Sequence, residues 1–257
     1  EHYFDGADWL NQQTDANPLF AAALPNKFVA IVPAALGAEL ARQVTDTVRA
    51  WVKEKAEAAW LELLGSAGEP DNPTLHAHQQ ITVQLKNFPE VHWALVPFAP
   101  LARDTGQGVD VKELEIAQAP FRPVGDKGFL GGNAWKLLNR ELKVDGARFY
   151  RPNPGVLYPA LYDLLDRMQA AAKAVRPFPQ LEQTGYRCSL CGEREWLTTD
   201  RRQLPLPPGE RKTLWTVVAE RKPAWARKGE HLCGPCALKR LWPSLLVGEI
   251  ADLLDQD

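Results

Sequence analysis

The chain has 257 residues, of which 45% are hydrophobic and 24% charged, and its formal net charge is −2. This composition is that of an ordinary globular protein; it excludes a disordered chain, and the charge gives no global argument for nucleic-acid binding. No apolar run approaches the roughly 18 residues of a membrane span and no signal peptide opens the sequence, which starts at Glu1 and is expected to be part of a longer protein.

The first half of the chain predicts a strand, a long helix and a second strand. Residues 28–32 (FVAIV) lie between two prolines and predict a buried strand. Apolar residues spaced three or four apart then predict an amphipathic helix over about 37–64, followed by a loop over 65–73. Residues 91–98 (VHWALVPF) predict the second strand. Residues 78–88 alternate like a strand and also have helical spacing, so their pattern leaves both open.

The second half is mostly helical up to the first cysteine. Residues 97–108 are loop-like and residues 125–132 form a glycine-rich break. A short helix is expected over 133–142, and a strong helix over 155–178 that stops at Pro177. A strand, a long helix and a further strand are compatible with a ferredoxin-like α+β domain.

All four cysteines occur in two Cys-x-x-Cys pairs, within YRCSLCGEREW and HLCGPCALKRLW. In each pair two thiolates can hold one tetrahedral ion about 2.3 Å from each sulfur, and Gly192 and Gly234 suit the tight turns beside them. The alternative is a redox pair, but no thioredoxin-like βαβ pattern surrounds either motif. A closed shell leaves no open coordination position, so the expected zinc is structural rather than catalytic. The predicted ligands are Cys188, Cys191, Cys233 and Cys236.

The 41 residues between the two pairs exceed the usual zinc-ribbon spacing and therefore predict an insertion. Within it, residues 204–210 (LPLPPGE) predict a loop and residues 213–218 (TLWTVV) a possible strand. Residues 186–241 contain twelve Lys and Arg against six Asp and Glu, and the rest of the chain is acidic. Such a basic region is expected to face RNA or an acidic protein surface. The alternative is that these side chains only keep the proline-rich loop soluble. The candidate contact residues are Arg201, Arg202, Arg211, Lys212, Arg221 and Lys222.

Other candidate chemistry is sparse. His76, His78 and His92 lie among core-type residues without a partnering carboxylate motif and are expected to be surface or core residues. His231 lies near Cys233, but four cysteines already complete a zinc shell. The run GFLGGNAW matches neither a Walker loop nor a dinucleotide fingerprint. Among the nine tryptophans, Trp196 and Trp242 are expected to pack around the knuckles.

Five segments in one order carry a family resemblance: LPNKFVAIVP with its following helix, FPEVHWALVP, NPGVLYPALYDLLDRMQAAAKAVRPF, YRCSLCGERE and HLCGPCALKR. Together they resemble the large, palm-polymerase-like subunit of type III-B CRISPR effector (Cmr) complexes, from about residue 8 to the last cysteine pair. The resemblance implies two palm domains of ferredoxin-like fold with a zinc site between them, often preceded by an HD nuclease. It would make the four cysteines that zinc site and residues 24–98 part of the first palm.

The sequence also departs from this family. Its one glycine pair is followed by Asn133-Ala134, so it has no Gly-Gly-Asp-Asp motif, and it has no His-Asp dipeptide. The family uses Gly-Gly-Asp-Asp in the second palm to bind metal and make cyclic oligoadenylate from ATP. ATP and a divalent metal are therefore expected only for the full-length subunit, and this chain is expected to be its middle part.

The sequence thus predicts an α+β chain: a partial first palm over 1–125, a mainly helical connector over 126–185, and a zinc-binding region with a terminal helix over 186–257. The expected role is a non-catalytic part of an RNA-guided antiviral effector. Its partners would be the other subunits, guide RNA and target RNA, with no membrane, and its thiols suit the reducing cytoplasm. The alternatives are a stand-alone zinc-stabilised nucleic-acid-binding module and a free-standing enzyme whose site the motifs do not reveal.

Overall fold

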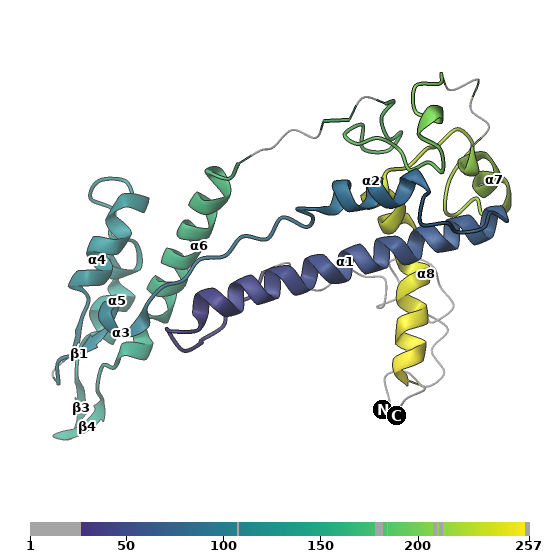
Figure 1. The fold of residues 1–257 in the computed structure, drawn as a ribbon. Helices are drawn as coiled ribbons and strands as arrows, with labels where there is room; N and C mark the ends of the chain where they lie inside the picture. Colours follow the sequence, from purple (N-terminus) through teal and green to yellow (C-terminus); the bar gives the residue numbers. More distant parts are fainter. Residues whose placement is uncertain are drawn as a thin grey trace. The chain divides into compact units, whose positions relative to one another are not determined.

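The computed structural model describes residues 27–106, 108–177, 182–183, 185–207, 210 and 213–254 (Figure 1). The chain is α+β, mainly helical, with two small antiparallel sheets of two strands each. The helices are α1 (Gly37–Ala67), α2 (His76–Leu85), α3 (Phe98–Leu101), α4 (Lys112–Gln118), α5 (Asn133–Leu138), α6 (Tyr158–Ala174), α7 (Leu214–Arg221) and α8 (Gly234–Leu254). The strands are β1 (Arg103–Asp104) with β2 (Val109–Asp110), and β3 (Leu142–Val144) with β4 (Ala147–Tyr150).

The described residues form two compact units. Unit 1 contains residues 27–32, 44–89 and the described part of 182–254, and unit 2 contains residues 33–43 and 90–177. Unit 1 therefore joins a segment of the predicted palm to the predicted zinc region, across a long stretch of sequence. The two units do not follow the domain boundaries at residues 125 and 185 that the sequence suggested.

Helix α1 contributes a tryptophan and two leucines to the core of unit 1. Trp60, Leu63 and Leu64 are buried on one stripe of the helix, because positions three and four apart share a face. The helix ends at Ala67, three residues later than predicted, and is followed by Gly68, which has a φ of +74°. The N–H of Glu69 donates to the carbonyl of Leu64 at 3.0 Å, and the N–H of Gly68 to that of Gly65 at 3.1 Å. This pair of bonds is a Schellman cap.

Helices α2 and α8 complete the core of unit 1 by packing against each other. Helix α2 buries Ala77, Ile81 and Leu85, which lie four residues apart on one face. Helix α8 buries Leu238 and Leu241 in the same core. The second cysteine pair lies at its N-terminus, with Cys233 before the helix and Cys236 in its first turn, so the packing of these two helices positions that pair.

Unit 2 has a separate core centred on α6. Leu157, Leu161 and Leu164 are buried there against residues of α4 and α5. Arg122 is nearly buried and forms an ion pair with Asp163 on α6. Unit 2 thus has its own apolar cluster and its own buried ion pair.

Several sequence-based elements are confirmed. The predicted long helix is α1, and the predicted short helix is α5, which ends at Leu138. The segment over 78–88, whose pattern fitted both a strand and a helix, is helical up to Leu85 as part of α2. The strong helix over 155–178 is α6, preceded by a 3-10 turn at Pro154–Leu157. None of the helices in the described part combines the length and apolar character needed to cross a bilayer.

Three predicted strands are wrong. Residues 28–32 and 91–97 belong to no helix or strand, and residues 214–218 belong to α7. Phe28 and Ile31 are 76% and 96% exposed, so the first segment is not buried either. A β-type sequence becomes a strand only when its backbone pairs with a neighbour. Within the described ranges, strands pair only in the hairpins β1–β2 and β3–β4, and β1 lies in the segment predicted to be a loop.

Candidate metal centre

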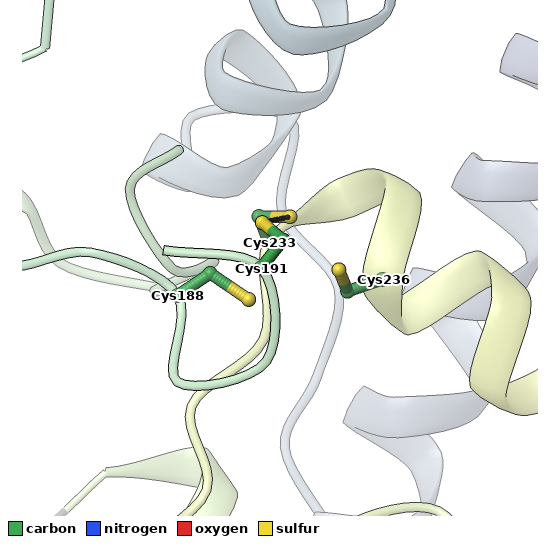
Figure 2. A group of neighbouring side chains, drawn as sticks. All are labelled: Cys188, Cys191, Cys233 and Cys236. Atoms are coloured by element: carbon green, nitrogen blue, oxygen red, sulfur yellow. Dashed lines mark hydrogen bonds between the residues drawn. The ribbon is translucent and has the colours of Figure 1, made fainter. Parts of the chain in front are cut away.

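The four predicted ligands come together in unit 1. One sulfur atom from each of Cys188, Cys191, Cys233 and Cys236 lies within 4.8 Å of the other three (Figure 2). Four sulfurs bound tetrahedrally at about 2.3 Å would be about 3.8 Å apart. The sulfurs of Cys191 and Cys233 are 3.6 Å apart. The arrangement therefore fits one tetrahedral ion with four sulfur ligands, as structural zinc requires.

The first knuckle is a tight hairpin around Cys188 and Cys191. The N–H of Cys188 donates to the carbonyl of Arg194 at 2.7 Å, and the N–H of Gly192 donates to the carbonyl of Cys188 at 2.9 Å. Gly192 has a φ of +68°, which favours glycine at this turn. The N–H of Leu190 points to the Sγ of Cys188 at 3.4 Å and stabilises negative charge on that sulfur.

The second knuckle lies at the N-terminus of α8. Cys233 precedes the helix and Cys236 is in its first turn, as Figure 2 shows. The N–H of Ala237 donates to the carbonyl of Cys233 at 2.8 Å. The positive end of the helix dipole favours the thiolate form of cysteines placed here. Both knuckles are therefore built to present thiolates.

The crowded sulfurs have widely separated pKa values. Hydrogen bonds from Cys233 and Cys236 hold the pKa of Cys188 far below its usual range. The hydrogen bond with Cys188 is the main cause that raises the pKa of Cys233 far above its usual range. The hydrogen bond with Cys236 and the burial of the thiol raise this pKa further. Contact with Cys188 is also the main cause that raises the pKa of Cys236 to about 12. Four thiolates can coexist at this spacing when a cation compensates their charge, which a bound metal ion does.

Two buried glutamines on α2 bond to the backbone that follows the first knuckle, and one of them, Gln84, also bonds to the second knuckle. The Nε2 of Gln84 donates to the carbonyl of Glu195 at 2.7 Å, and its Oε1 accepts from the N–H of Gly234 at 2.8 Å. Gln80 forms a similar pair of bonds with residues 196 and 198. Sequence reasoning missed both glutamines. In the sequence they stand out only as two amide side chains four residues apart, in a segment whose pattern fitted both a strand and a helix.

His231 lies beside the cluster but is held by other groups. Its Nδ1 is 3.1 Å from the carbonyl of Gly229, and its Nε2 is 3.3 Å from the Oγ1 of Thr213. The ring packs edge-on against Trp196, with centroids 4.8 Å apart. Trp196 and Trp242 both belong to the core that contains the cysteines, as expected. The metal-type cluster itself consists of the four cysteines.

The other three histidines that the structure describes gather no ligand set. His78 contacts Asp71 at 2.9 Å and His92 lies 3.5 Å from Glu90. His76 is half-buried, and its pKa is lowered first by burial and then by the charge of Arg201. In the parts of the chain that the structure describes, the four cysteines are the one group of three or more metal-type side chains.

The basic residues of the insertion mostly have partners within the chain. Arg202 pairs with Asp200 at 2.7 Å, which raises the pKa of Arg202 and lowers that of Asp200. Arg221 donates to the carbonyl of Ser66 at 3.0 Å, and Lys222 lies 5.2 Å from the ring centre of Trp225. Exposed Arg201 begins a 3-10 turn. Arg211 and Lys212 lie outside the described residues, as do residues 208–209 of the proline-rich loop.

Comparisons with protein-family models, with curated proteins and with solved structures give no match. The function of the chain therefore has to be inferred from this metal centre, from the cores around it and from the order of the sequence motifs.

Proposed function

We propose that this chain is a zinc-organised, structural part of the large subunit of an RNA-guided, RNA-targeting type III-B CRISPR effector complex in the cytoplasm. The observation that supports this most is the closed four-cysteine cluster, at the positions where the resemblance expects a zinc site. A shell of four thiolates has no open position for a substrate or water, so the ion contributes folding free energy.

The same proposal expects the complete subunit to cover apolar side chains that are exposed in residues 28–32 and 91–97. Neither segment belongs to a helix or strand, and the side chains of Phe28, Ile31, Trp93 and Leu95 are 40% exposed or more. Exposed apolar side chains gathered in this way are suited to burial against a further part of the subunit. The synthesis of cyclic oligoadenylate from ATP and a divalent metal would belong to the second palm.

Assembly tests this proposal. The chain is co-expressed with the remaining subunits of a type III-B complex and guide RNA, and the complex is purified through another subunit. We expect the chain to co-purify with about one zinc per copy. A chain that contains zinc but does not associate with the guide-loaded complex, even at low salt, would contradict the assignment to this effector.

Charge reversal then tests the role of the basic insertion. Arg202 and Arg221 have internal partners, so the cleaner variant changes Arg201, Arg211 and Lys212 to Glu. We expect weaker assembly, and a similar weakening of the unaltered chain by added salt. A matched control reverses exposed Arg103, Lys136 and Lys143 of unit 2. Equal effects of the two triple variants would mean that the insertion has no specific contact.

A stand-alone zinc-stabilised nucleic-acid-binding module is the second candidate. The surplus of six positive charges over residues 186–241 favours it. The internal partners of Arg202, Arg221 and Lys222 reduce the number of cations available to phosphates. Titration of the isolated chain with duplex and single-stranded RNA distinguishes the two. Tight binding with a steep salt dependence would favour the stand-alone module.

A further inference from the structure

We infer that Gln84 is a positioning residue of the metal centre, whose side-chain amide fixes both cysteine knuckles at once. This inference rests on the metal binding that the proposed function assigns to the four cysteines. It concerns a residue about 100 positions away in sequence from the nearest ligand.

The two hydrogen bonds of Gln84 end beside ligands from different knuckles. Its donor bond goes to the carbonyl of Glu195, which pairs with Arg187 next to Cys188. Its acceptor bond comes from the N–H of Gly234, which directly follows Cys233. One planar amide thus sets the distance between the two backbone turns that carry the sulfurs.

The surroundings of Gln84 leave it little freedom. The side chain is 3% exposed, so an unmade bond would leave a buried polar group without a partner. A Cβ added at Gly234 would lie 3.2 Å from the Oε1 of Gln84 and 3.8 Å from Ile81. Helix α2 therefore approaches the second knuckle closely, and a side chain at position 234 would require the Gln84 amide to shift by a few tenths of an ångström.

Gln80 provides a matched comparison on the same helix. It is also buried, and its amide donates to the carbonyl of Trp196 at 3.0 Å and accepts from the N–H of Thr198 at 3.0 Å. Both bonds go to the strand-like segment after the first knuckle, and neither goes to the second. Loss of Gln80 should therefore destabilise the docking of α2 without changing how the knuckles face each other.

Other contacts limit the expected effect of losing Gln84. The N–H of Ser189 donates to the carbonyl of His231 at 3.0 Å, and the N–H of Leu197 to that of Leu232 at 2.8 Å. These backbone bonds also join the two knuckles. We therefore expect a weakened metal site rather than a lost one, about 10- to 100-fold in zinc affinity, as is usual for residues that orient metal ligands.

The test compares the full chain with Gln84→Met, Gln80→Met and Gln79→Met, the last being an exposed glutamine of α2. Each protein is stripped of metal under reducing conditions, titrated with Co²⁺ for its ligand-field spectrum, and then competed with Zn²⁺. Gln84→Met should bind zinc about 10- to 100-fold more weakly and shift the Co²⁺ bands. Gln80→Met should lower the free energy of unfolding but keep the Co²⁺ spectrum, and Gln79→Met should change neither.

The outcomes separate this inference from the proposed function. Equal zinc affinities and Co²⁺ spectra for Gln84→Met and Gln80→Met would overturn the role of Gln84 alone. Failure of the unaltered chain to bind either metal would overturn the metal centre and this inference with it. Should Gln84→Met fail to fold, Gln84→Glu replaces it, because the carboxylate keeps the acceptor for Gly234 and loses the donor to Glu195.

Discussion

At the scale of single residues, the metal centre depends on backbone turns as much as on sulfur. Gly192 provides the positive φ that closes the first knuckle, and the N–H of Leu190 points at the Cys188 sulfur. Cys233 and Cys236 lie at the start of α8, where the helix dipole favours their thiolates. The four cysteines are therefore oriented by short-range structure, and a bound ion would join two turns already shaped for it.

Replacing one ligand should abolish the site. Cys191→Ser removes one thiolate and leaves three sulfurs around the ion. We expect bound zinc to fall from about one per chain towards zero, and residues 185–254 to lose protease resistance, because metal binding here is folding free energy. Elemental analysis and limited proteolysis measure both. The matched control is Leu190→Ser, at a 53% exposed neighbour in the same knuckle, which should retain the metal.

Protonation of His76 should lower the free energy of unfolding as the pH falls. Burial, then the charge of Arg201, lowers its pKa in the folded chain below the ordinary value of 6.5. Between those two values the unfolded chain binds more protons, so this contribution to stability is complete above about pH 6.5 and is lost as the pH falls below it. In His76→Gln the stability should fall less between pH 7.5 and about pH 5.5. Denaturant titrations at both pH values check this, and identical losses in both proteins would contradict it.

At the scale of elements, α1 stabilises unit 1 through one stripe of side chains. Leu63 is fully buried in that core, whereas Leu61 on the same helix is 48% exposed. Leu63→Ala should cost about 2–5 kcal/mol of unfolding free energy, because it leaves a cavity. Leu61→Ala should change it by no more than about 0.5 kcal/mol. Denaturation of the zinc-loaded chain, followed by tryptophan fluorescence, compares the two, and similar costs would contradict the assigned packing.

Elements were predictable from sequence where one short-range pattern determined them. The local sequence patterns of α1 and α6 predicted both helices, and the two Cys-x-x-Cys pairs predicted the four-cysteine cluster. Residues 213–218 were misjudged because their β-branched residues suggested a strand. Buried Leu214, Trp215 and Val218 instead follow helical spacing. The indole N–H of Trp215 also donates to the carbonyl of Leu197 at 2.7 Å.

Long-range contacts were beyond the reach of local patterns. Gln80 and Gln84 bond to residues more than 100 positions away, and nothing nearby in the sequence marks those partners. Likewise, residues 28–32 have a strand-like composition, but a strand also needs a pairing neighbour, which local sequence does not specify. The palm sheet remains a proposal for that reason.

At the scale of the whole molecule, the chain is proposed to be structural rather than catalytic. Palm nucleotidyl chemistry requires carboxylates that hold divalent ions against a triphosphate. Residues 28–32 contain no carboxylate, and the sequence has no Gly-Gly-Asp-Asp motif. We expect the purified chain, incubated with ATP and Mg²⁺ or Mn²⁺, to form no cyclic oligoadenylate by chromatography. Product that co-elutes with the chain through successive purification steps would contradict this and indicate an active site elsewhere in it.

The central claim is that one metal ion organises unit 1 by holding together segments far apart in sequence. Hydrogen exchange of the full chain, read by mass spectrometry with zinc bound and after its removal, tests this most directly. We predict that α2, the first knuckle and the start of α8 lose protection together, because α2 bonds to the backbone beside the ligands. Helix α6 has its own core in unit 2 and should keep its protection. Unchanged protection of α2 after complete metal removal would contradict the claim.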